Sequence, residues 1–564
     1  MSSITDKRID NILSQLQLNN TRAAGDSGIL ESPYKPLDIP TNLSFHQFLF
    51  KRWNEKKFDN MKALTDAATG ETWTYKQLKQ NIIQFSNGLY DQGVRQHSVL
   101  GIYSSNCLEY STVVYACSVL GAVCCLINPV YTDNELLHHL NDSGASHLFT
   151  QSAKVDIVHK VQSKANKLKH IFTFDNNNKS LKTFADVLNQ GKSQGASMLH
   201  EGKIDPVNDI QILPYSSGTT GLAKGVMLTH YNLLSNVLQF NDSRYLDVGE
   251  PGEVLNCVLP LYHIYAASCI MNMGLYNGSH IIILNGFAPD TFLETIQKYK
   301  VERMALVPPL INFMTKSPLT DKYDLSSVKH VSSGAAPLTK ENEQEFQAKF
   351  KGLRIKQGYG MSETSPVTHA HPANNIRGGS IGKLICNMTA KIVDPETGKT
   401  VPAGSGKRGE LWLAGPNIMK GYWRNEKSTK DTIDSDGYLH TGDVAYVDND
   451  GYYYIVDRIK ELIKVKGLQV APAELEGLLL SHPDIDDAAV IQVPDERAGE
   501  LPRAYVVKKS GANLSEQQVK DYIAKQVAPH KKLDGGVKFI AAVPKAASGK
   551  ILRRELRELA KKEG

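Results

Sequence analysis

Short apolar runs alternate with helix-like segments along most of the chain from Ser44 onward. Three of these runs are 99–103, 281–284 and 304–307, and nearly every residue in them is apolar. A run of this kind is typical of a strand covered on both faces, because a half-exposed strand alternates apolar with polar residues. The pattern therefore predicts an α/β fold built on buried parallel strands.

The pattern changes after about residue 378, where Gly, Asp and short alternating segments become frequent. The turn 448–451 separates two strand-like segments, as in a β-hairpin. After Asp457 a new set of two helical and three strand-like patterns begins, and a small α+β domain of roughly 100 residues can be built from it. We therefore expect a poorly packed polar lead-in at 1–44, a large domain at 45–456 whose β-rich part is 378–456, and a small C-terminal domain at 457–564.

No charged residue lies between Glu109 and Asp133, and this stretch is long enough for a membrane-spanning helix. It contains Gly121 together with Ser, Asn and Pro, and its hydrophobicity is only moderate. We favour a buried helix that ends near Gly121, followed by a buried strand that leads to Asn128. The N-terminus has no apolar signal core and the C-terminus is not a Ser-Lys-Leu address, so a cytoplasmic location is expected.

Composition narrows the classes of function. A chain of 564 residues is too long for one hydrophobic core. A net charge of +5, without a compact basic patch, is not typical of nucleic-acid-binding proteins. The seven cysteines lie mostly in apolar runs without Cys-x-x-Cys spacing, so buried thiols in a reducing compartment are favoured over a zinc site or a disulfide framework. The oligomeric state is left open.

One segment between two strand-like runs is rich in hydroxyl groups and glycine. Its glycines allow the backbone to approach an anion, its hydroxyls can donate hydrogen bonds, and its lysine is cationic. It lacks the Gly-Lys-Ser/Thr order and the following helix of a Walker loop, and by composition alone a flexible surface loop remains an alternative. The residues in question are Ser216, Ser217, Gly218, Thr219, Thr220, Gly221, Lys224 and Gly225.

This segment closely resembles the signature loop of the acyl-adenylate-forming enzymes, which include acyl-CoA synthetases, 4-coumarate–CoA ligases, luciferases and adenylation domains. The resemblance covers residues 45–556, and further signatures follow in family order. They are LYHIYA at 261–266, SSGAAPL at 332–338, QGYGMSET at 357–364, GYLHTGD at 437–443, VDRIKELIKVKGLQVAPAELE at 456–476 and PKAASGKILRREL at 544–556. It implies a large N-terminal domain of αβαβα layers and a small mobile C-terminal domain.

The resemblance also implies a reaction in which a carboxylate attacks the α-phosphate of ATP and expels pyrophosphate. It assigns Glu363 to Mg²⁺, and Lys550 to the bridge between the acid and the α-phosphate. The remaining ATP-binding positions that it implies, beyond the signature loop, are Gly334, Ala335, Ala336, Gln357, Gly358, Tyr359, Gly360, Ser362, Asp443 and Arg458.

A second half-reaction with coenzyme A is implied as well. The C-terminal domain would rotate at a hinge in 457–460, so that Lys550 leaves the site. The positions that then face the nucleotide or coenzyme A are Lys464, Lys466, Gly467 and Gln469, with Lys460 as the hinge residue. The acyl pocket is expected to include His263, Tyr265, Cys269, Ala335, Gly360, Pro366 and Val367, of which His263 has either an orienting or a proton-handling role.

Two positions depart from the family pattern. Ala223 replaces a common proline in the signature loop, and Asn285-Gly286-Phe287 replaces a segment in which coumarate ligases carry a lysine. The second change leaves this chain without the lysine that, by the resemblance, would meet the coenzyme A nucleotide. The expected function is an acyl-CoA ligase for an aryl or fatty acid. A luciferase-type monooxygenase and a module that loads a carrier protein remain alternatives. A non-catalytic nucleotide-binding module is disfavoured because Glu363 and Lys550 are both present.

Overall fold

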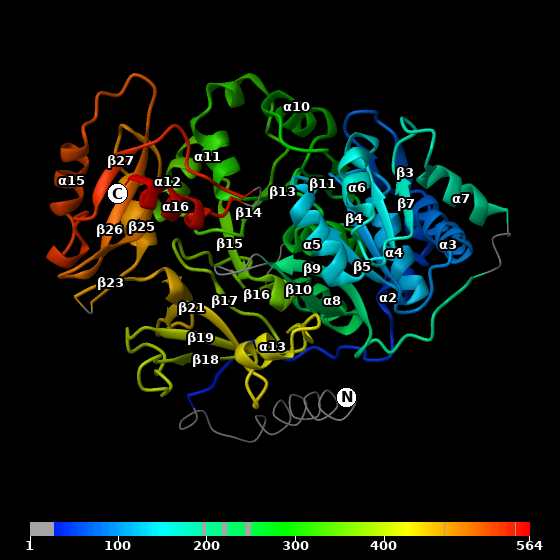
Figure 1. The fold of residues 1–564 in the computed structure, drawn as a ribbon, viewed down its shortest axis with the longest axis horizontal. Coiled ribbons are helices and arrows are strands. Elements are labelled where there is room, and N and C mark those ends of the chain that lie inside the picture. Colours follow the sequence, from blue (N-terminus) through cyan, green and yellow to red (C-terminus); the bar gives the residue numbers. More distant parts are fainter. Residues whose placement is uncertain are drawn as a thin grey trace.

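A computed structural model describes residues 28–193, 199–216, 223–242, 250–466, 468–546 and 549–563. Two large sheets, a smaller antiparallel sheet and a separate C-terminal sheet make up the molecule. Figure 1 shows the C-terminal part, coloured orange to red, on the opposite side of the molecule from strands β4 and β7. Within the described residues, no helix is both long and apolar enough to cross a membrane.

The first large sheet has nine strands in the order β17-β16-β15-β14-β13-β11-β12-β2-β3. Its strands from β15 to β2 are parallel, and antiparallel strands form both edges. The strands are β2 (Lys62–Asp66), β3 (Thr72–Thr74), β11 (Val254–Cys257), β12 (His280–Ile283), β13 (Arg303–Leu306), β14 (His330–Ser333), β15 (Ile355–Gly360), β16 (Val367–Ala370) and β17 (Lys383–Leu384).

The second large sheet has eight strands in the order β20-β10-β9-β5-β4-β6-β7-β8. Its strands from β9 to β8 are parallel, whereas β10 and β20 are antiparallel to their neighbours. The strands are β4 (Val99–Tyr103), β5 (Val123–Ile127), β6 (His147–Thr150), β7 (His170–Thr173), β8 (Lys182–Thr183), β9 (Ile210–Ser216), β10 (Lys224–Thr229) and β20 (Gly421–Tyr422).

Helices cover both large sheets and form a shared layer between them. Short connections with capping side chains start several of them; Thr229, for example, ends β10 and accepts the backbone N–H of Asn232 at the start of α8. The helices of the large domain are α2 (Phe45–Trp53), α3 (Tyr75–Asp91), α4 (Tyr110–Leu120), α5 (Asp133–Ser143), α6 (Val155–Gln162), α7 (Phe184–Lys192), α8 (His230–Phe240), the π-helix η4 (Tyr265–Asn272), α9 (Met273–Asn277), α10 (Pro289–Tyr299), α11 (Pro308–Lys316), α12 (Lys340–Lys349) and α13 (Glu426–Thr432).

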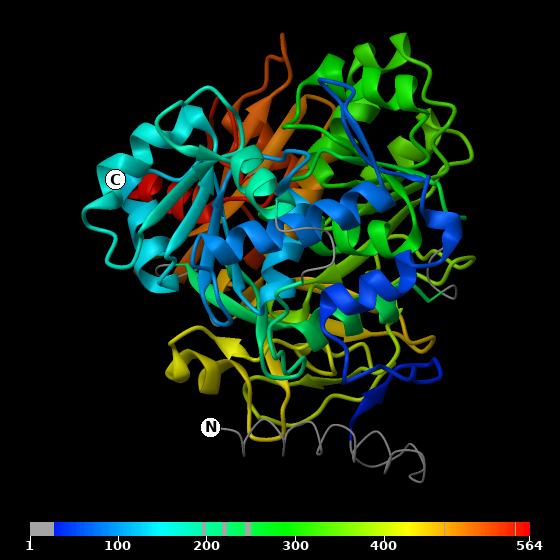
Figure 2. The same ribbon diagram turned by 90° about the vertical axis from the view of Figure 1, so that its right-hand side faces the viewer.

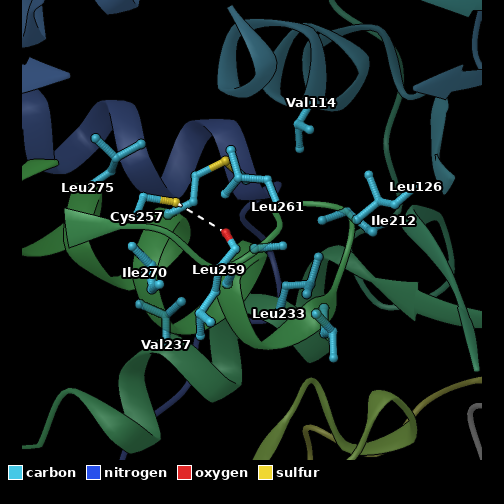
Figure 3. Packing of buried hydrophobic residues seen from close by; sticks show 14 of the residues in the cluster. Val114, Leu126, Ile212, Leu233, Val237, Cys257, Leu259, Leu261, Ile270 and Leu275 are labelled. Atoms are coloured by element: carbon cyan, nitrogen blue, oxygen red, sulfur yellow. Dashed lines mark hydrogen bonds between the residues drawn. The ribbon is translucent and has the colours of Figure 1, made fainter. Parts of the chain in front are cut away.

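The main hydrophobic core lies between the two large sheets and extends over the faces of both. Figure 3 shows its centre, where Leu126 and Ile212 of the second sheet, Cys257 of the first and Ile270 of η4 belong to one cluster. A second cluster joins the other face of the second sheet to α5 and α6. Because these apolar strands are covered on both faces, the predicted α/β architecture is confirmed.

Burial also explains why the stretch 110–132 contains no charged residue. Every residue of α4 is buried, Gly121 ends the helix with φ of 66°, and all five residues of β5 are buried. A positive φ of this size suits glycine, which has no Cβ to clash with the backbone. The prediction of a buried helix followed by a buried strand is therefore confirmed, and the membrane alternative is not supported.

The β-rich part forms a five-stranded antiparallel sheet below the two large sheets (Figures 1 and 2). The predicted hairpin at 448–451 joins its last two strands. The strands are β1 (Leu30–Glu31), β18 (Thr389–Val393), β19 (Gly409–Ala414), β21 (Leu439–Val447) and β22 (Tyr453–Arg458).

The described part of the lead-in differs from our expectation. Strand β1 pairs with β18, and the backbone N–H of Leu37 donates to Asn387 Oδ1 at 2.8 Å. Leu30, Tyr34 and Leu37 pack against the core. The lead-in was expected to be poorly packed because it is polar and rich in proline, but its spaced apolar residues find partners on a distant sheet.

The C-terminal sheet has its own hydrophobic core. The chain passes from the β-rich sheet to the C-terminal sheet between Arg458, which ends β22, and Ile463, which starts β23. The strands are β23 (Ile463–Val465), β24 (Leu468–Val470), β25 (Ile485–Asp495), β26 (Gly499–Lys508) and β27 (Gly536–Phe539), and the helices are α14 (Pro472–Leu480), α15 (Glu516–Ala524) and α16 (Arg553–Glu563).

Candidate active site

A cavity of about 2180 Å³ lies where the large domain, the β-rich sheet and the C-terminal domain meet. Its wall includes Gly334, Ala335 and Gly360 at the carboxyl ends of β14 and β15, and parallel α/β sheets generally bind ligands at these ends. Many of the predicted site residues line it, although they are far apart in the sequence. They are Ser216, Lys224, His263, Tyr265, Cys269, Gly334, Ala335, Gln357, Gly358, Tyr359, Gly360, Ser362, Glu363, Pro366, Val367, Arg458, Lys460 and Lys550.

Other predicted site residues lie elsewhere. Ala336 is not part of the cavity wall, and Asp443 is buried behind it. Lys464, Lys466 and Gln469 are exposed on the β23–β24 hairpin, away from the cavity. Ser217, Gly218, Thr219, Thr220 and Gly467 lie outside the described residues.

Asp443 is held by two neighbours that line the cavity. The Tyr359 hydroxyl donates to Asp443 Oδ2 at 2.5 Å, and Arg458 Nε lies 3.3 Å from Asp443 Oδ1. Asp443 and Arg458 are directly opposite each other on β21 and β22. Burial raises the pKa of the Asp443 carboxyl, while Arg458 and the Tyr359 hydrogen bond oppose this effect. The Asp443 carboxylate can accept hydrogen bonds from hydroxyl groups.

Lys550 extends into the same region from the C-terminal domain. A tight turn positions it, because the backbone N–H of Ala546 donates to the Lys550 carbonyl at 2.8 Å. Burial and the neighbouring Arg458 lower the pKa of the Lys550 ammonium to about 8, while Asp443, Glu461 and Glu363 favour its charged form. A partly desolvated cation in a cavity is suited to stabilising developing negative charge.

Glu363 lies on the short 3-10 helix η6 (Ser362–Thr364), which contacts β9 and β10. Its side chain is only 5% exposed, and Oε1 accepts a hydrogen bond from the Tyr422 hydroxyl at 2.8 Å. Lys224 Nζ lies 4.9 Å from the centre of the Tyr422 ring. Tyr422 therefore connects the carboxylate to the lysine. This arrangement leaves Oε2 of Glu363 without a hydrogen bond among the described residues, and a carboxylate oxygen of this kind suits Mg²⁺ that is also held by phosphate and water.

His263 lines the cavity near Lys550. Burial and the positive charge of Lys550 lower the pKa of His263 to about 4, so the ring is neutral at pH 7. The backbone N–H of Tyr265 donates to His263 Nδ1 at 3.3 Å. Since Nδ1 accepts, the single proton of the neutral ring is on Nε2. His263 can therefore donate one hydrogen bond from Nε2.

Residues of η4 and β16 form another part of the cavity wall. Tyr265 and Cys269 lie on η4, a π-helix of a kind that often occurs at functional sites. A Cβ at Gly334 would lie 3.1 Å from Cζ of the Tyr265 ring, so glycine permits the close contact. The side chain of Asn236 forms hydrogen bonds with both the N–H and the carbonyl of Val367.

Three residues around the cavity were not singled out by sequence reasoning. They are Tyr422, which contacts Glu363; Asn236, which holds Val367; and Glu461, whose charge favours the protonated form of Lys550. Glu461 lies inside one of the signature segments and could have been found there. No local pattern marks Tyr422 or Asn236, because each acts on a residue more than fifty positions away.

Comparisons with known proteins identify the family. The family described as AMP-binding enzyme matches residues 50–423, and the family described as AMP-binding enzyme C-terminal domain matches residues 474–550. The chain is 41% identical to 4-coumarate--CoA ligase 2 of Petroselinum crispum over 94% of this chain and 96% of that one. It is 42% identical to 4-coumarate--CoA ligase of Vanilla planifolia over the same shares of the two chains.

Solved structures give the same result. The fold is similar to that of the anthranilate CoA ligase AuaEII in complex with anthranoyl-AMP, with a TM-score of 0.85, 26% identity and coverage of 94% of this chain and 99% of that chain. It is also similar to ATP-bound MatB from Rhodopseudomonas palustris, with a TM-score of 0.82, 27% identity and coverage of 92% and 99%. The chain therefore belongs to the family of AMP-binding, acyl-adenylate-forming enzymes.

Proposed function

We propose that this chain is an ATP-dependent acid–thiol ligase, which converts a carboxylic acid first to an acyl-adenylate and then to an acyl-CoA thioester. The single observation that carries this proposal is the position of Lys550. Its side chain lines the cavity, and Asp443, Arg458 and His263 are close enough to interact with its charge. A cation there can neutralise both an incoming carboxylate and the α-phosphate that it attacks.

In the adenylation step, the chain must orient the carboxylate of the acid and the α-phosphate of ATP, two anions that repel each other. Asp443 accepts the ribose hydroxyls, and Tyr359 and Arg458 hold its carboxylate in place. Lys224 and the hydroxyls of the signature loop, with Ser216 at the cavity wall, hold the phosphates that leave as pyrophosphate. The Nε2–H of neutral His263 donates to the acid and orients one carboxylate oxygen. Lys550 stabilises the charge that builds at the α-phosphate.

Mg²⁺ fits the Glu363 carboxylate because one oxygen is engaged by Tyr422 and the other has no hydrogen bond among the described residues. When bound, the ion neutralises phosphate charge. Glu363 and Ser362 would hold it and the α-phosphate beside the cavity wall.

In the thioester step, coenzyme A is the acceptor and the C-terminal domain rotates about Lys460. The present arrangement has Lys550 in the cavity and Lys464, Lys466 and Gln469 exposed outside it. This arrangement corresponds to the adenylation step. Rotation about a few backbone angles, as in hinge motions of other enzymes, would move Lys550 out of the cavity and bring the exposed residues of the β23–β24 hairpin into it.

The test measures pyrophosphate release by the full chain with ATP, Mg²⁺ and a panel of aryl and linear carboxylic acids, with and without coenzyme A. We expect pyrophosphate release with at least one acid and a matching acyl-CoA when coenzyme A is present. The Lys550→Met variant should lose acid-dependent ATP–pyrophosphate exchange by about 10²–10³-fold, because a preorganised charge is removed from the transition state. Its thermal unfolding should stay close to that of the parent protein.

Separate outcomes contradict separate parts of the proposal. Pyrophosphate without any thioester would rule out the ligase and leave adenylation standing, and light emission with luciferin or transfer to a carrier protein would then identify the second step. Normal exchange in Lys550→Met would rule out the assigned role of Lys550.

A further inference from the structure

Helix α5 lies against the two strands that flank the signature loop (Figure 1). Strand β9 ends at Ser216, β10 starts at Lys224, and these two residues are paired across the strands. Their neighbours Tyr215 and Ala223 each form a hydrogen bond with a side chain of α5. One helix therefore contacts the chain on both sides of the loop.

The first contact is made by His138. Its Nε2 lies 3.3 Å from the carbonyl oxygen of Ala223. A carbonyl oxygen only accepts, so the imidazole donates this hydrogen bond. The bond restrains the peptide group that joins Ala223 to Lys224, and thereby the direction in which the Lys224 side chain leaves the backbone. His138, Ala223 and Lys224 all line the cavity.

The second contact is made by Asp142, one helical turn further along α5. The Tyr215 hydroxyl donates to Asp142 Oδ2 at 2.6 Å. Burial, and after it the nearby Cys125 and Asp142, raise the pKa of the Tyr215 hydroxyl, so it remains a protonated donor at neutral pH. The ring of His139 also packs on the Tyr215 ring, with 4.1 Å between the ring centres. The end of β9 is therefore held by a hydrogen bond and by ring packing.

Asp142 also contacts the segment after β20 through its backbone. Its carbonyl oxygen accepts hydrogen bonds from Trp423 Nε1 and Arg424 Nη1, both at 3.0 Å. The backbone N–H of Trp423 in turn donates to the Gly225 carbonyl on β10 at 2.8 Å. Because these bonds use the backbone of Asp142, the end of α5 should stay in place when the side chain at 138 or 142 is replaced.

The spacing of the two side-chain contacts suits a pair of neighbouring strands. Residues four apart on a helix lie on the same face and about 6 Å apart along its axis, and neighbouring strands are about 5 Å apart. His138 and Asp142 can therefore reach both strands at once. Together they limit how far Ser216 and Lys224 can move relative to each other.

We propose that His138 and Asp142 are positioning residues, which hold Ser216 and Lys224 in the arrangement that binds the β- and γ-phosphates of ATP. The proposal rests on the proposed function, from which the role of Ser216 and Lys224 is taken. Without either contact, only a fraction of the molecules has the two strands in the binding arrangement. The apparent affinity for the phosphates falls by that fraction.

The experiment measures the dissociation constants of ATP, with Mg²⁺, and of AMP for the full chain by titration calorimetry. No acid is added, so the identity of the acid does not matter. In His138→Ala the Kd for ATP should rise about 3–10-fold through loss of one hydrogen bond, whereas the Kd for AMP, which lacks the β- and γ-phosphates, should change by less than about 2-fold. His138→Gln, whose amide can donate to the same carbonyl, should restore most of the ATP affinity.

Asp142 is tested in the same way. Asp142→Ala removes the acceptor of the Tyr215 hydroxyl and should raise the Kd for ATP about 3–10-fold, while Asp142→Asn keeps an acceptor oxygen and should stay close to the parent protein. If Asp142→Ala does not fold, Tyr215→Phe removes the same hydrogen bond and is judged by the same result. Asn141→Ala is the matched control on α5, because the Asn141 side chain bonds Lys164 and Asn166 and not the strands.

The outcomes separate this proposal from the proposed function. An unchanged Kd for ATP in a folded variant that lacks one contact overturns the role of that residue, and equal weakening of ATP and AMP overturns the positioning of the phosphate-binding residues. If the parent protein binds ATP and releases no pyrophosphate with any acid, the ligase function is wrong and the positioning result stands. If the parent protein does not bind ATP, both are wrong.

Discussion

At the scale of single residues, burial decides which charge state each group in the cavity has. Burial disfavours the charged forms of both Lys550 and His263, yet only Lys550 stays charged at neutral pH. The pKa of Lys550 falls only to about 8, since Asp443, Glu461 and Glu363 favour the ammonium. The pKa of His263 falls to about 4, where Lys550 adds to the effect of burial. One group therefore remains a cation at neutral pH, and the other is a neutral donor.

The first prediction concerns pH. Lys550 is cationic below its pKa of about 8 and loses its charge as the pH rises through that value, well below the usual range of lysine. Acid-dependent ATP–pyrophosphate exchange, measured without coenzyme A so that its thiol does not contribute, should decline above about pH 8. In Arg458→Gln, which removes a cation that disfavours the ammonium, the remaining activity should decline at a higher pH. A constant rate up to pH 10 in the parent protein would contradict the role of Lys550.

The second prediction concerns Tyr359. Its hydroxyl donates to Asp443 at 2.5 Å, and Tyr359→Phe removes this hydrogen bond while keeping the ring. Loss of one hydrogen bond to a buried carboxylate should cost about 1–3 kcal/mol. We expect the KM for ATP to rise about 5–100-fold with a smaller change in kcat, as measured by initial rates over a range of ATP concentrations. A larger effect on the KM for the acid than on that for ATP would speak against ribose binding at Asp443.

At the scale of elements, close backbone contacts hold the site together. Asn106, which lies between β4 and α4, illustrates this: its side chain donates to the carbonyls of Leu259 and Leu284 and accepts from the N–H of Leu261. It thereby fixes the segment that leads to His263. Gly549, which precedes Lys550, has φ of 79° and packs against Pro309 at the start of α11. Glycine is required there by both the backbone angle and the contact.

The third prediction tests this contact. A Cβ at Gly549 would lie 2.9 Å from Pro309 Cδ, and the residue would also be strained by its positive φ. Gly549→Ala should therefore disfavour the arrangement with Lys550 in the cavity and slow adenylation about 10-fold or more. Thioester formation from a supplied acyl-adenylate should change much less, because that step does not use Lys550. Equal slowing of both half-reactions would show that the substitution damages the fold in general.

At the scale of the whole molecule, the C-terminal domain carries one set of residues assigned to adenylation and another assigned to the thioester step. The two sets lie in different places. Lys550 lies in the cavity, whereas Lys464 is exposed on the β23–β24 hairpin. Both belong to one domain with a core of its own. If the domain moves as a unit, the residues that are outside in one half-reaction are inside in the other.

The fourth prediction is that substitutions of Lys464 and Lys550 impair opposite half-reactions. Lys464→Ala should reduce thioester formation from a supplied acyl-adenylate about 10-fold or more and leave ATP–pyrophosphate exchange close to that of the parent protein. Lys550→Met should show the reverse pattern. Lys520→Ala, a lysine on α15, is a control for loss of a surface charge in the same domain. If Lys464→Ala impairs both half-reactions equally, the domain does not alternate in the proposed way.

Much of the fold follows from local patterns. Apolar runs such as 99–103 and 281–284 predicted buried strands, and the structure has β4 and β12 there. Gly121 was expected to end a helix, and it does so with a positive φ. These predictions succeed because a strand covered on both faces and a helix end each impose a residue pattern over a few neighbouring positions. The packing of the lead-in on β18 was missed, since its partner is more than 350 positions away.

The sequence by itself determined the family, the order of the elements and the residue types available for adenylation, because motifs and apolar runs are local properties of the chain. Only the tertiary structure decided their surroundings. It brought Tyr422 to Glu363, buried Lys550 beside Arg458, and left one face of β13, β14 and β15 accessible along the cavity. Desolvation, pairing of charges and the shape of a cavity all depend on atoms that are close in space and distant in sequence, so no local pattern records them.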